Sequence, residues 1–289
     1  MKNILITGAT GNIGTEVIKY LFKANTTNRI VAGVRNIEKA KLSLINFPIL
    51  EYVVFDFENP STFDHSLQNI DIVFLLRPPH ISDINLYFNP LILKIKAHGI
   101  KQVVFLSVQG AEKSKVIPHN KIEKLVVDSQ LDYVFLRPSY FMQNLTTTFW
   151  RELHNQRMIT LPAGNTKFNW IDIENIGEVA ATVLDKFDDY KNECIELTGY
   201  ENENFHNVVT IINNQIENKI KYRDVSPFLF YRLKKKEGMQ TGLILVMIML
   251  HILPRFQKAP IISENYERIT GRKPTTLTQF IEREVERFK

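Results

Sequence analysis

The chain has 289 residues, of which 44% are hydrophobic and 23% charged, a composition that excludes disorder on compositional grounds. Its net charge is only +5 and its basic residues are scattered, so nucleic-acid binding is not expected, and its single cysteine, Cys194, excludes an intramolecular disulfide. No apolar run reaches the roughly 20 residues of a membrane-spanning helix, and the N-terminus lacks the apolar stretch of a signal peptide. We therefore expect a cytoplasmic protein that contacts no membrane.

Short apolar runs alternate with helical patterns through the first half of the chain. Strands are predicted at residues 4–6, 29–34, 52–55, 72–76, 103–106 and 133–136, and helices at 13–24, 38–44, 86–98 and 119–129. The strands are continuous apolar runs, so both faces of their sheet should be covered by helices. This order predicts an α/β fold with a Rossmann-type, doubly wound parallel sheet.

The second half of the chain is less regular. It predicts a helix at 177–187, a strand at 193–197 and a final helix at 277–288. The apolar run 243–250 and the following His251, Ile252 and Leu253 are interpreted as a buried helix, with an oligomer or lipid contact as the alternative. The run of Lys234, Lys235 and Lys236 is interpreted as a solvated surface, with a phosphate or nucleic-acid contact as the alternative.

A glycine-rich turn follows the first predicted strand and opens the first helix. Gly8 allows a sharp turn, Gly11 lets the backbone approach a pyrophosphate, and Gly14 lets the helix pack closely on the sheet. Free N–H groups at the helix start favour an anion. We expect this turn to bind a nicotinamide dinucleotide through Gly8, Thr10, Gly11, Asn12, Ile13 and Gly14. The alternative is a tight turn without a ligand.

The residues after the second and third strands bear on the choice of dinucleotide. An acidic residue about 20 residues beyond the glycines would favour NAD, but this chain has Arg35 there, with Lys39 four residues later. Cations suit a 2′-phosphate, so NADP(H) is expected in preference to NAD(H), unless Arg35 is a mere surface residue. Asp56 and Phe57 are expected at the adenine, with an N-cap and a packing residue as the alternatives.

Gly8-x-x-Gly11-x-x-Gly14 with Arg35 resembles the NmrA-like branch of the atypical short-chain dehydrogenase/reductases. Residues 131–144, 170–177 and 270–280 resemble further segments of that branch, in the same order. The branch includes NAD(P)H:quinone oxidoreductase-like enzymes and regulators that bind the dinucleotide without turnover. The resemblance implies an NAD(P)-binding domain at residues 1–150, completed by 168–198, and an interleaved substrate-binding lobe mainly at 151–289. The C-terminal lobe, including the apolar stretch from Leu243, is expected to form the acceptor pocket.

The proton-donating Tyr-x-x-x-Lys pair usual in short-chain dehydrogenases is absent, because Lys115 and His119 hold the two positions. This departure argues against alcohol or ketone chemistry and leaves an activated, quinone-like acceptor. His119 is expected to contact the nicotinamide ribose or to supply a proton near neutral pH, with a surface or capping role as the alternative. Lys121 is a rival on the same helical turn.

Further site residues are expected after the fourth, fifth and sixth strands. Ser107 would hydrogen-bond substrate or the nicotinamide amide, and the cofactor ribose would lie beside Leu76, Arg77 and Pro78. Tyr140, Phe141 and Asn144 would wall the substrate pocket, with Tyr140 also touching the cofactor; core packing is the alternative for the two aromatic residues. The seven histidines show no metal-binding pattern.

These patterns favour an NADP(H)-dependent oxidoreductase, monomeric or homodimeric, that reduces a small, quinone-like acceptor. The alternative is a non-catalytic redox sensor that binds a partner protein. A third hypothesis is an imine or enone reductase of secondary metabolism.

Overall fold

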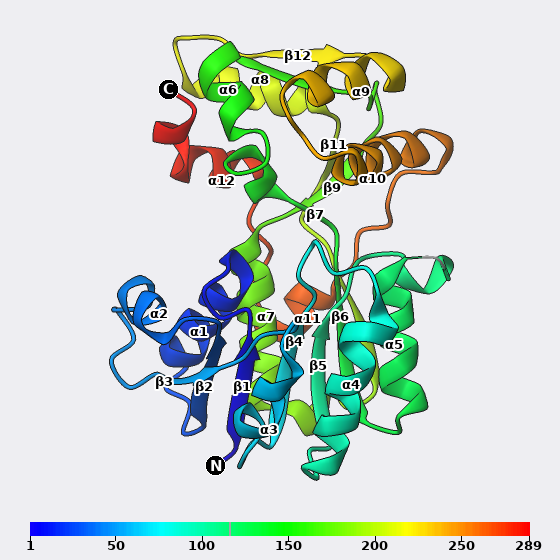
Figure 1. Cartoon of the computed structure of the whole chain (residues 1–289). Helices are drawn as coiled ribbons and strands as arrows, with labels where there is room; N and C mark the ends of the chain where they lie inside the picture. Colours follow the sequence, from blue (N-terminus) through cyan, green and yellow to red (C-terminus); the bar gives the residue numbers. More distant parts are fainter. Residues whose placement is uncertain (116) are drawn as a thin grey trace. The chain divides into compact units, whose positions relative to one another are not determined.

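The computed structural model describes residues 1–115 and 117–289, and the chain divides into two compact units (Figure 1). Unit 1 comprises Met1–Pro138, Ile173–Leu197 and Asn265–Arg272, and unit 2 comprises Ser139–Asp172, Thr198–Glu264 and Lys273–Lys289. The first segment of unit 1 ends at Pro138, and residues 168–172 belong to unit 2; the functional assignment of residues 1–150 and 151–289 stays a prediction. Residues 265–272 return to unit 1 because Tyr266 is buried there, with its hydroxyl 2.6 Å from Glu178 Oε2.

Unit 1 contains the expected parallel sheet. Its seven strands lie in the order β10-β6-β5-β4-β1-β2-β3, and every pairing is parallel. The strands are β1 (Asn3–Thr7), β2 (Arg29–Val34), β3 (Glu51–Val54), β4 (Ile72–Leu76), β5 (Gln102–Leu106), β6 (Asp132–Pro138) and β10 (Glu193–Leu197). The chain order reverses between β1 and β4, so the Rossmann-type prediction is confirmed.

Helices cover both faces of this sheet (Figure 1). They are α1 (Asn12–Lys23), α2 (Ile37–Ser43), α3 (Phe63–Ser66), α4 (Ile84–Ala97), α5 (Pro118–Asp128), α7 (Ile173–Asp185) and α11 (Asn265–Thr270). On one face, Phe88 of α4 and Ile122 of α5 share a core cluster with Val73 and Val103. Elsewhere α1 and α7 cross closely, because a Cβ on Gly177 would lie 2.6 Å from Glu16 Cβ.

Short 3₁₀ turns complete unit 1, at η1 (Pro60–Thr62), η2 (Ala111–Lys113) and η4 (Phe187–Asp189). Local sequence explains the helix starts. Asn36 and Asp83 accept backbone N–H bonds at the N-termini of α2 and α4, and Pro118 occupies the first turn of α5.

Unit 2 is built around an aromatic core and two small sheets. One sheet has the order β11-β9-β7, and the other pairs β12 with β8. The strands are β7 (Tyr140–Phe141), β8 (Met158–Leu161), β9 (Phe168–Ile171), β11 (Asn202–Glu203) and β12 (Lys221–Asp224). The core includes Trp170, Phe205, Phe230 and Phe280, all fully buried.

The helices of unit 2 enclose that core. They are α6 (Trp150–Gln156), α8 (Phe205–Gln215), α9 (Pro227–Lys236), α10 (Thr241–Ile252) and α12 (Leu277–Arg283), with turns η3 (Met142–Leu145), η5 (Leu253–Phe256) and η6 (Val285–Arg287). The predicted final helix 277–288 is therefore interrupted after Arg283. None of the helices in the described ranges is long and apolar enough to cross a bilayer.

Two predictions for unit 2 need correction. The apolar run does form helix α10, but the prediction that this helix is buried is wrong, because only Ile244, Met247 and His251 are buried. The unit 2 core accepts one stripe of the helix and leaves the rest at the surface. Lys234 is also not solvated, because its ammonium lies 2.7 Å from Glu152 and 3.1 Å from Glu237 and is buried.

Candidate functional site: the carboxyl edge of the unit 1 sheet

All seven strands of unit 1 run in the same direction, so the residues that follow them meet at one edge of the sheet. In such folds ligands bind at this carboxyl edge, at the point where the strand order reverses. The glycine turn follows β1 and the loop of Leu76 and Arg77 follows β4, so both flank the reversal. Arg35 follows β2 and Ser107 follows β5 at the same edge.

The glycine turn has the backbone geometry that a close ligand requires. Gly8 has φ +62°, a conformation that strains any residue with a side chain, and the N–H of Gly11 donates to the Gly8 carbonyl at 2.9 Å. A Cβ on Gly14 would lie 2.3 Å from the Gly8 oxygen, so α1 can start this close to β1 only with glycine there. The predicted reasons for Gly8 and Gly14 are confirmed.

The turn also presents unfilled donors. Gly11 is the N-cap of α1 and no side chain caps this helix, so the first N–H groups of the helix have no helical acceptor. Gly8, Thr10, Gly11 and Asn12 are exposed, whereas Ile13 and Gly14 are buried. The residues present therefore fit the diphosphate of a dinucleotide: a bend without side chains, open to solvent, with backbone donors and the positive end of the helix dipole.

The two cations expected at the 2′-phosphate lie in the next strand–helix connection. Arg35 directly follows β2, Lys39 lies in the first turn of α2, and both side chains are exposed. Asn36 between them accepts the N–H of Lys39 at 2.9 Å, which fixes this turn. No ion pair binds either cation within the described part of the chain, so both charges face solvent.

Asp56 and Phe57 have structural roles after β3. The Asp56 carboxylate accepts the N–H of Glu58 at 3.0 Å, which is a turn contact. Phe57 is buried, with its ring 4.9 Å from that of Phe55 and 5.2 Å from that of Phe88. These contacts favour the packing interpretation for Phe57, and an adenine contact by the pair stays a prediction.

The loop after β4 is held by Arg77. Its guanidinium donates to the carbonyls of Pro78, Pro79 and Ile81, at 3.1, 3.2 and 2.6 Å. Its Nε also donates to His119 Nε2 at 3.4 Å, so this histidine nitrogen must be an acceptor. Leu76 lies beside the glycine turn, because its Cδ1 would be 3.1 Å from a Cβ on Gly8.

His119 is neutral in this surrounding. Its ring stacks on Phe105 at 6.1 Å, and burial, together with the charge of Arg77, lowers its pKa from 6.5 to about 3. This low pKa argues against His119 as a proton donor near pH 7, and its part in catalysis stays a prediction. The ring is half-buried and accepts from Arg77, which favours a contact within the site over a plain surface or capping role.

Ser107 belongs to a buried cluster of charged residues that the sequence reasoning missed. Its hydroxyl donates to Glu123 Oε1 at 2.5 Å, and Arg137 donates to both oxygens of that carboxylate at 3.0 and 2.7 Å. Glu123 and Arg137 are only 7% and 11% exposed. Burial disfavours the Arg137 cation, but the bond to Glu123 outweighs this and raises its pKa. We call these three residues the Ser107 cluster.

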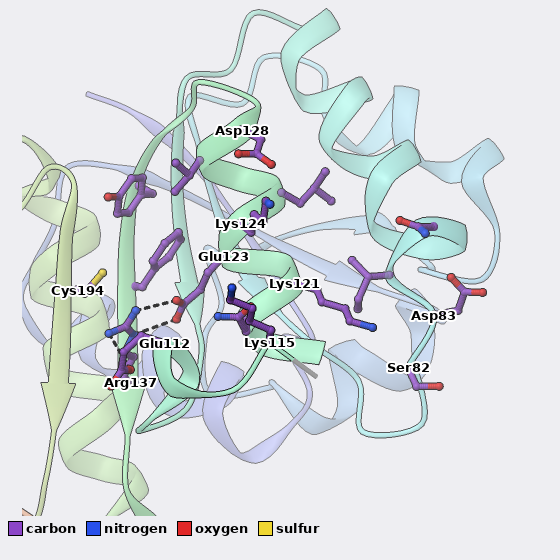
Figure 2. Close-up of a pocket in the computed structure, with 17 residues that line it drawn as sticks. Ser82, Asp83, Glu112, Lys115, Lys121, Glu123, Lys124, Asp128, Arg137 and Cys194 are labelled. Carbon is purple, nitrogen blue, oxygen red and sulfur yellow. Dashed lines mark hydrogen bonds and ion pairs between the residues drawn. The ribbon is translucent and has the colours of Figure 1, made fainter. Parts of the chain in front are cut away.

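Arg137, Glu123 and Glu112 line a surface hollow of about 950 Å³. Figure 2 shows Arg137 and Glu123 facing each other, with Glu112 beside them. Glu112 lies 3.1 Å from Arg137 and extends the network. Lys121 lines the same hollow and is exposed. It is therefore on the solvent side of α5, whereas the Ser107 hydroxyl is buried. The structure does not bring Lys121 and Ser107 into one hydrogen-bonded group.

The residues expected to wall the substrate pocket lie in unit 2. The Tyr140 ring lies 4.8 Å from Trp170 and 5.3 Å from Phe168, so it packs in the aromatic core, and burial raises its hydroxyl pKa. Its hydroxyl is 3.0 Å from His251 Nε2. Asn144 accepts the Thr148 hydroxyl at 3.2 Å, and Phe141 is half-buried at the end of β7. Substrate contacts by these residues stay predictions.

Potential metal ligands do not cluster: among the residues described here, no three His, Cys, Asp or Glu side chains are grouped to hold an ion.

Comparison with known proteins identifies the family. A profile of the NmrA-like family matches residues 1–278. The chain belongs to the NmrA-like family. Over 281 residues it is 31% identical to Prestalk A differentiation protein A of Dictyostelium discoideum, which covers 96% of this chain and 91% of that protein. It is 25% identical over 281 residues to the NAD(P)H azoreductase of Xenophilus azovorans, which covers 96% of both.

A solved member of similar fold is the NADPH-dependent quinone oxidoreductase of Escherichia coli in complex with NADPH. The two folds agree with a TM-score of 0.86 at 22% identity, over 97% of this chain and 99% of that one. At this identity the likeness concerns the fold, and it agrees with the sheet order found in unit 1.

In this NmrA-like chain, the positions of the short-chain dehydrogenase pair do not form a proton-donating site. Lys115 is exposed and His119 is half-buried and neutral. The buried charges at this edge instead belong to Glu123 and Arg137. One signal could have found Arg137: it is a basic residue between Leu136 and Pro138 in a largely apolar strand, and a charged residue rarely lies buried without a partner.

Proposed function

We propose that this protein binds NADP(H), in preference to NAD(H), at the carboxyl edge of unit 1, and that it reduces a small, activated, quinone-like acceptor. One observation supports the proposal above all: a turn with a positive φ at Gly8 and a contact at Gly14 that only glycine permits. This turn leaves the backbone N–H groups at the start of α1 open to solvent, where a diphosphate can accept their hydrogen bonds. Packing of the strand against the helix alone does not require these open donors.

Each group at this edge has a distinct part in that binding. The N–H groups that begin α1 hold the diphosphate, and Arg35 and Lys39 pair with the 2′-phosphate. Leu76 and Pro78 would line the ribose, and Arg77 holds their loop through three carbonyls. The bound nicotinamide would supply the hydride. The Ser107 hydroxyl donates its hydrogen bond to Glu123, so its oxygen would be free to accept from an amide N–H.

The electrostatics of His119 bear on the class of acceptor. A ketone needs an acid aimed at its developing alkoxide, and His119 is neutral with a pKa of about 3. A quinone-like acceptor forms a stabilised phenolate that takes its proton from water. This favours quinones, azo compounds and other activated acceptors over simple carbonyl compounds. The names of two relatives agree, since one is an azoreductase and the other a quinone oxidoreductase.

A non-catalytic redox sensor is the second candidate. The same lack of a positioned acid favours it, and a relative with 31% identity is named for a part in differentiation and not for a reaction. In this case the dinucleotide binds as above and no acceptor is reduced.

The binding part is tested by titration of NADPH and NADH into the wild type and Arg35→Asp. A charge-assisted hydrogen bond contributes about 1.5–3 kcal/mol, so NADPH affinity should fall roughly ten-fold to a hundred-fold, with little change for NADH. Lys101→Asp is the matched control, since Lys101 is exposed and precedes β5 at the opposite edge of the sheet. Equal losses for both nucleotides would refute the role of Arg35.

Turnover separates the two candidate functions. NADPH oxidation is followed with a panel of quinones, azo compounds, imines and enones. Oxidation with quinones or azo compounds supports the reductase, whereas oxidation with imines or enones alone supports the third hypothesis. Tight NADPH binding without any oxidation supports the sensor.

A further inference from the structure

One face of α10 is apolar and open to solvent. Its exposed residues, with the first residue of η5, are 41–54% exposed: Leu243, Leu245, Val246, Met249, Leu250 and Leu253. We call these six residues the α10 face. A helix at the surface of a soluble protein carries polar residues at such positions. A contiguous apolar surface of this kind marks a contact site.

The opposite side of the helix already serves the fold. Ile244, Met247 and His251 recur at helical spacing and are buried in unit 2. His251 Nδ1 lies 2.6 Å from the Met247 carbonyl, which can only accept, so this nitrogen carries the proton. His251 Nε2 must then accept the Tyr140 hydroxyl, 3.0 Å away. The helix is therefore fixed by its inner stripe, and the α10 face is free for another partner.

Positive charge surrounds the α10 face. Residues 225–263 contain six lysines and arginines against one acidic residue, Glu237. Glu237 is paired with the buried Lys234, which Glu152 also neutralises. The Lys235 ammonium donates to the Thr241 hydroxyl at 3.0 Å, so it stands at the first residue of α10, and the exposed Arg255 follows in η5. Cations thus flank both ends of the helix.

We propose that the α10 face docks on the surface of an anionic lipid bilayer. Leucine, valine and methionine side chains would enter the boundary of the acyl chains while the flanking lysines and arginine pair with lipid headgroups. The helix would lie in the plane of the surface, because its inner stripe is buried in unit 2 and the α10 face runs along its opposite side. This proposal corresponds to the lipid contact that was given as the alternative for the apolar run. It differs from the expectation that the protein contacts no membrane.

Other occupants fit the charges and the chemistry less well. In a symmetric dimer the same patch meets itself, so Lys235 and Arg255 would approach their own copies and repel. A protein partner would need hydrogen bonds to fix its orientation, and none of the six side chains of the α10 face can form them. A lipid surface needs neither shape complementarity nor directional bonds.

The test is sedimentation of the full chain with vesicles. Vesicles of phosphatidylcholine alone are compared with vesicles that contain phosphatidylserine, at low and high salt. Wild type should bind the anionic vesicles and lose binding as salt rises. Leu250→Asp should weaken partitioning roughly ten-fold or more, because it removes a leucine that would be buried in the bilayer and adds a negative charge. Lys235→Gln should weaken it about five-fold.

Leu93→Asp is the matched control, since Leu93 is an exposed leucine of α4 in unit 1, 58% exposed against 51% for Leu250. It should bind vesicles as the wild type does, and circular dichroism checks that each variant is folded. Three results would overturn the proposal: wild type that ignores anionic vesicles, equal loss in Leu250→Asp and Leu93→Asp, or a wild-type dimer that Leu250→Asp dissociates. The test does not require turnover, so it stands apart from the proposed reductase activity.

Discussion

Two places on the carboxyl edge of one sheet are built on opposite principles. The glycine turn after β1 is made of backbone, and its geometry depends on side chains being absent at Gly8 and Gly14. The Ser107 cluster after β5 is made of side chains, with a carboxylate and a guanidinium buried against each other. The first is determined within seven consecutive residues, whereas the second joins residues 14 to 16 positions apart on three elements.

This difference determines which substitutions destabilise each part of the edge. A backbone turn fails when atoms are added, because the space is already filled. A buried ion pair fails when one partner is removed, because the other charge is left without compensation. The predictions below use this contrast.

The largest effect is expected for Arg137→Met. It leaves Glu123 buried without its cation, so the free energy of unfolding in urea should fall by about 3–5 kcal/mol. Arg29→Met is the control, because Arg29 also pairs with a glutamate, Glu51, but both are 44–46% exposed. That loss should be much smaller, because solvent screens an exposed ion pair. A double variant, Glu123→Leu with Arg137→Met, should recover part of the stability. Equal losses in the two single variants would contradict the contrast.

Gly14→Ala should have the next largest effect. Its Cβ would lie 2.3 Å from the Gly8 oxygen, so α1 must shift, at a cost of about 1–3 kcal/mol in unfolding free energy. Because that shift also displaces the donors, NADPH affinity should fall more than stability alone explains. Gly242→Ala is the control, since a Cβ there meets no atom within 4 Å and its φ is ordinary. Unchanged nucleotide binding in Gly14→Ala would mean that the turn is structural only.

The smallest effect is expected for His119→Asn in the pH dependence of the rate. With a pKa of about 3, His119 keeps one charge state around neutral pH, so the profile near 6.5 should be the same in both proteins. Loss of an ionisation near 6.5 in the variant would contradict this.

The same histidine should act on stability in acid. Its folded pKa lies below its unfolded value of 6.5, so the unfolded chain binds the proton more readily. The contribution of neutral His119 to the free energy of unfolding is therefore complete above pH 6.5 and is lost as the pH falls towards 3. As the pH falls from 6.5 towards 3, the free energy of unfolding should decrease more in the wild type than in His119→Asn.

The contrast also explains what the sequence could predict. Strands β2, β4 and β10 agree with their predicted bounds residue for residue. For β4 the reason is a continuous apolar run between Asp71 and Arg77. The glycine turn could be predicted because seven consecutive residues determine its geometry. The partners of Ser107 were not, because the strand order decides that 107, 123 and 137 meet.

The exposure of most of α10 was missed for a related reason. Apolar composition predicts a helix with low solubility in water, but it does not say how much of that helix the core can accept. Only one stripe fits the core of unit 2, and the remainder forms the α10 face. The division into units also depends on contacts that are distant in the sequence, since the Tyr266 hydroxyl is 3.0 Å from Asn175, 91 residues earlier.

The late return of α11 to unit 1 has a consequence for biosynthesis. The ribosome releases β1 first, but the surface of α7 around Glu178 waits for Tyr266 and Arg272, which follow 88 and 94 residues later. Unit 1 is thus completed only after residues 139–172 and 198–264 of unit 2 have been synthesised. A nascent chain stopped before residue 265 would expose the flank of α7 and would be a natural client for chaperones.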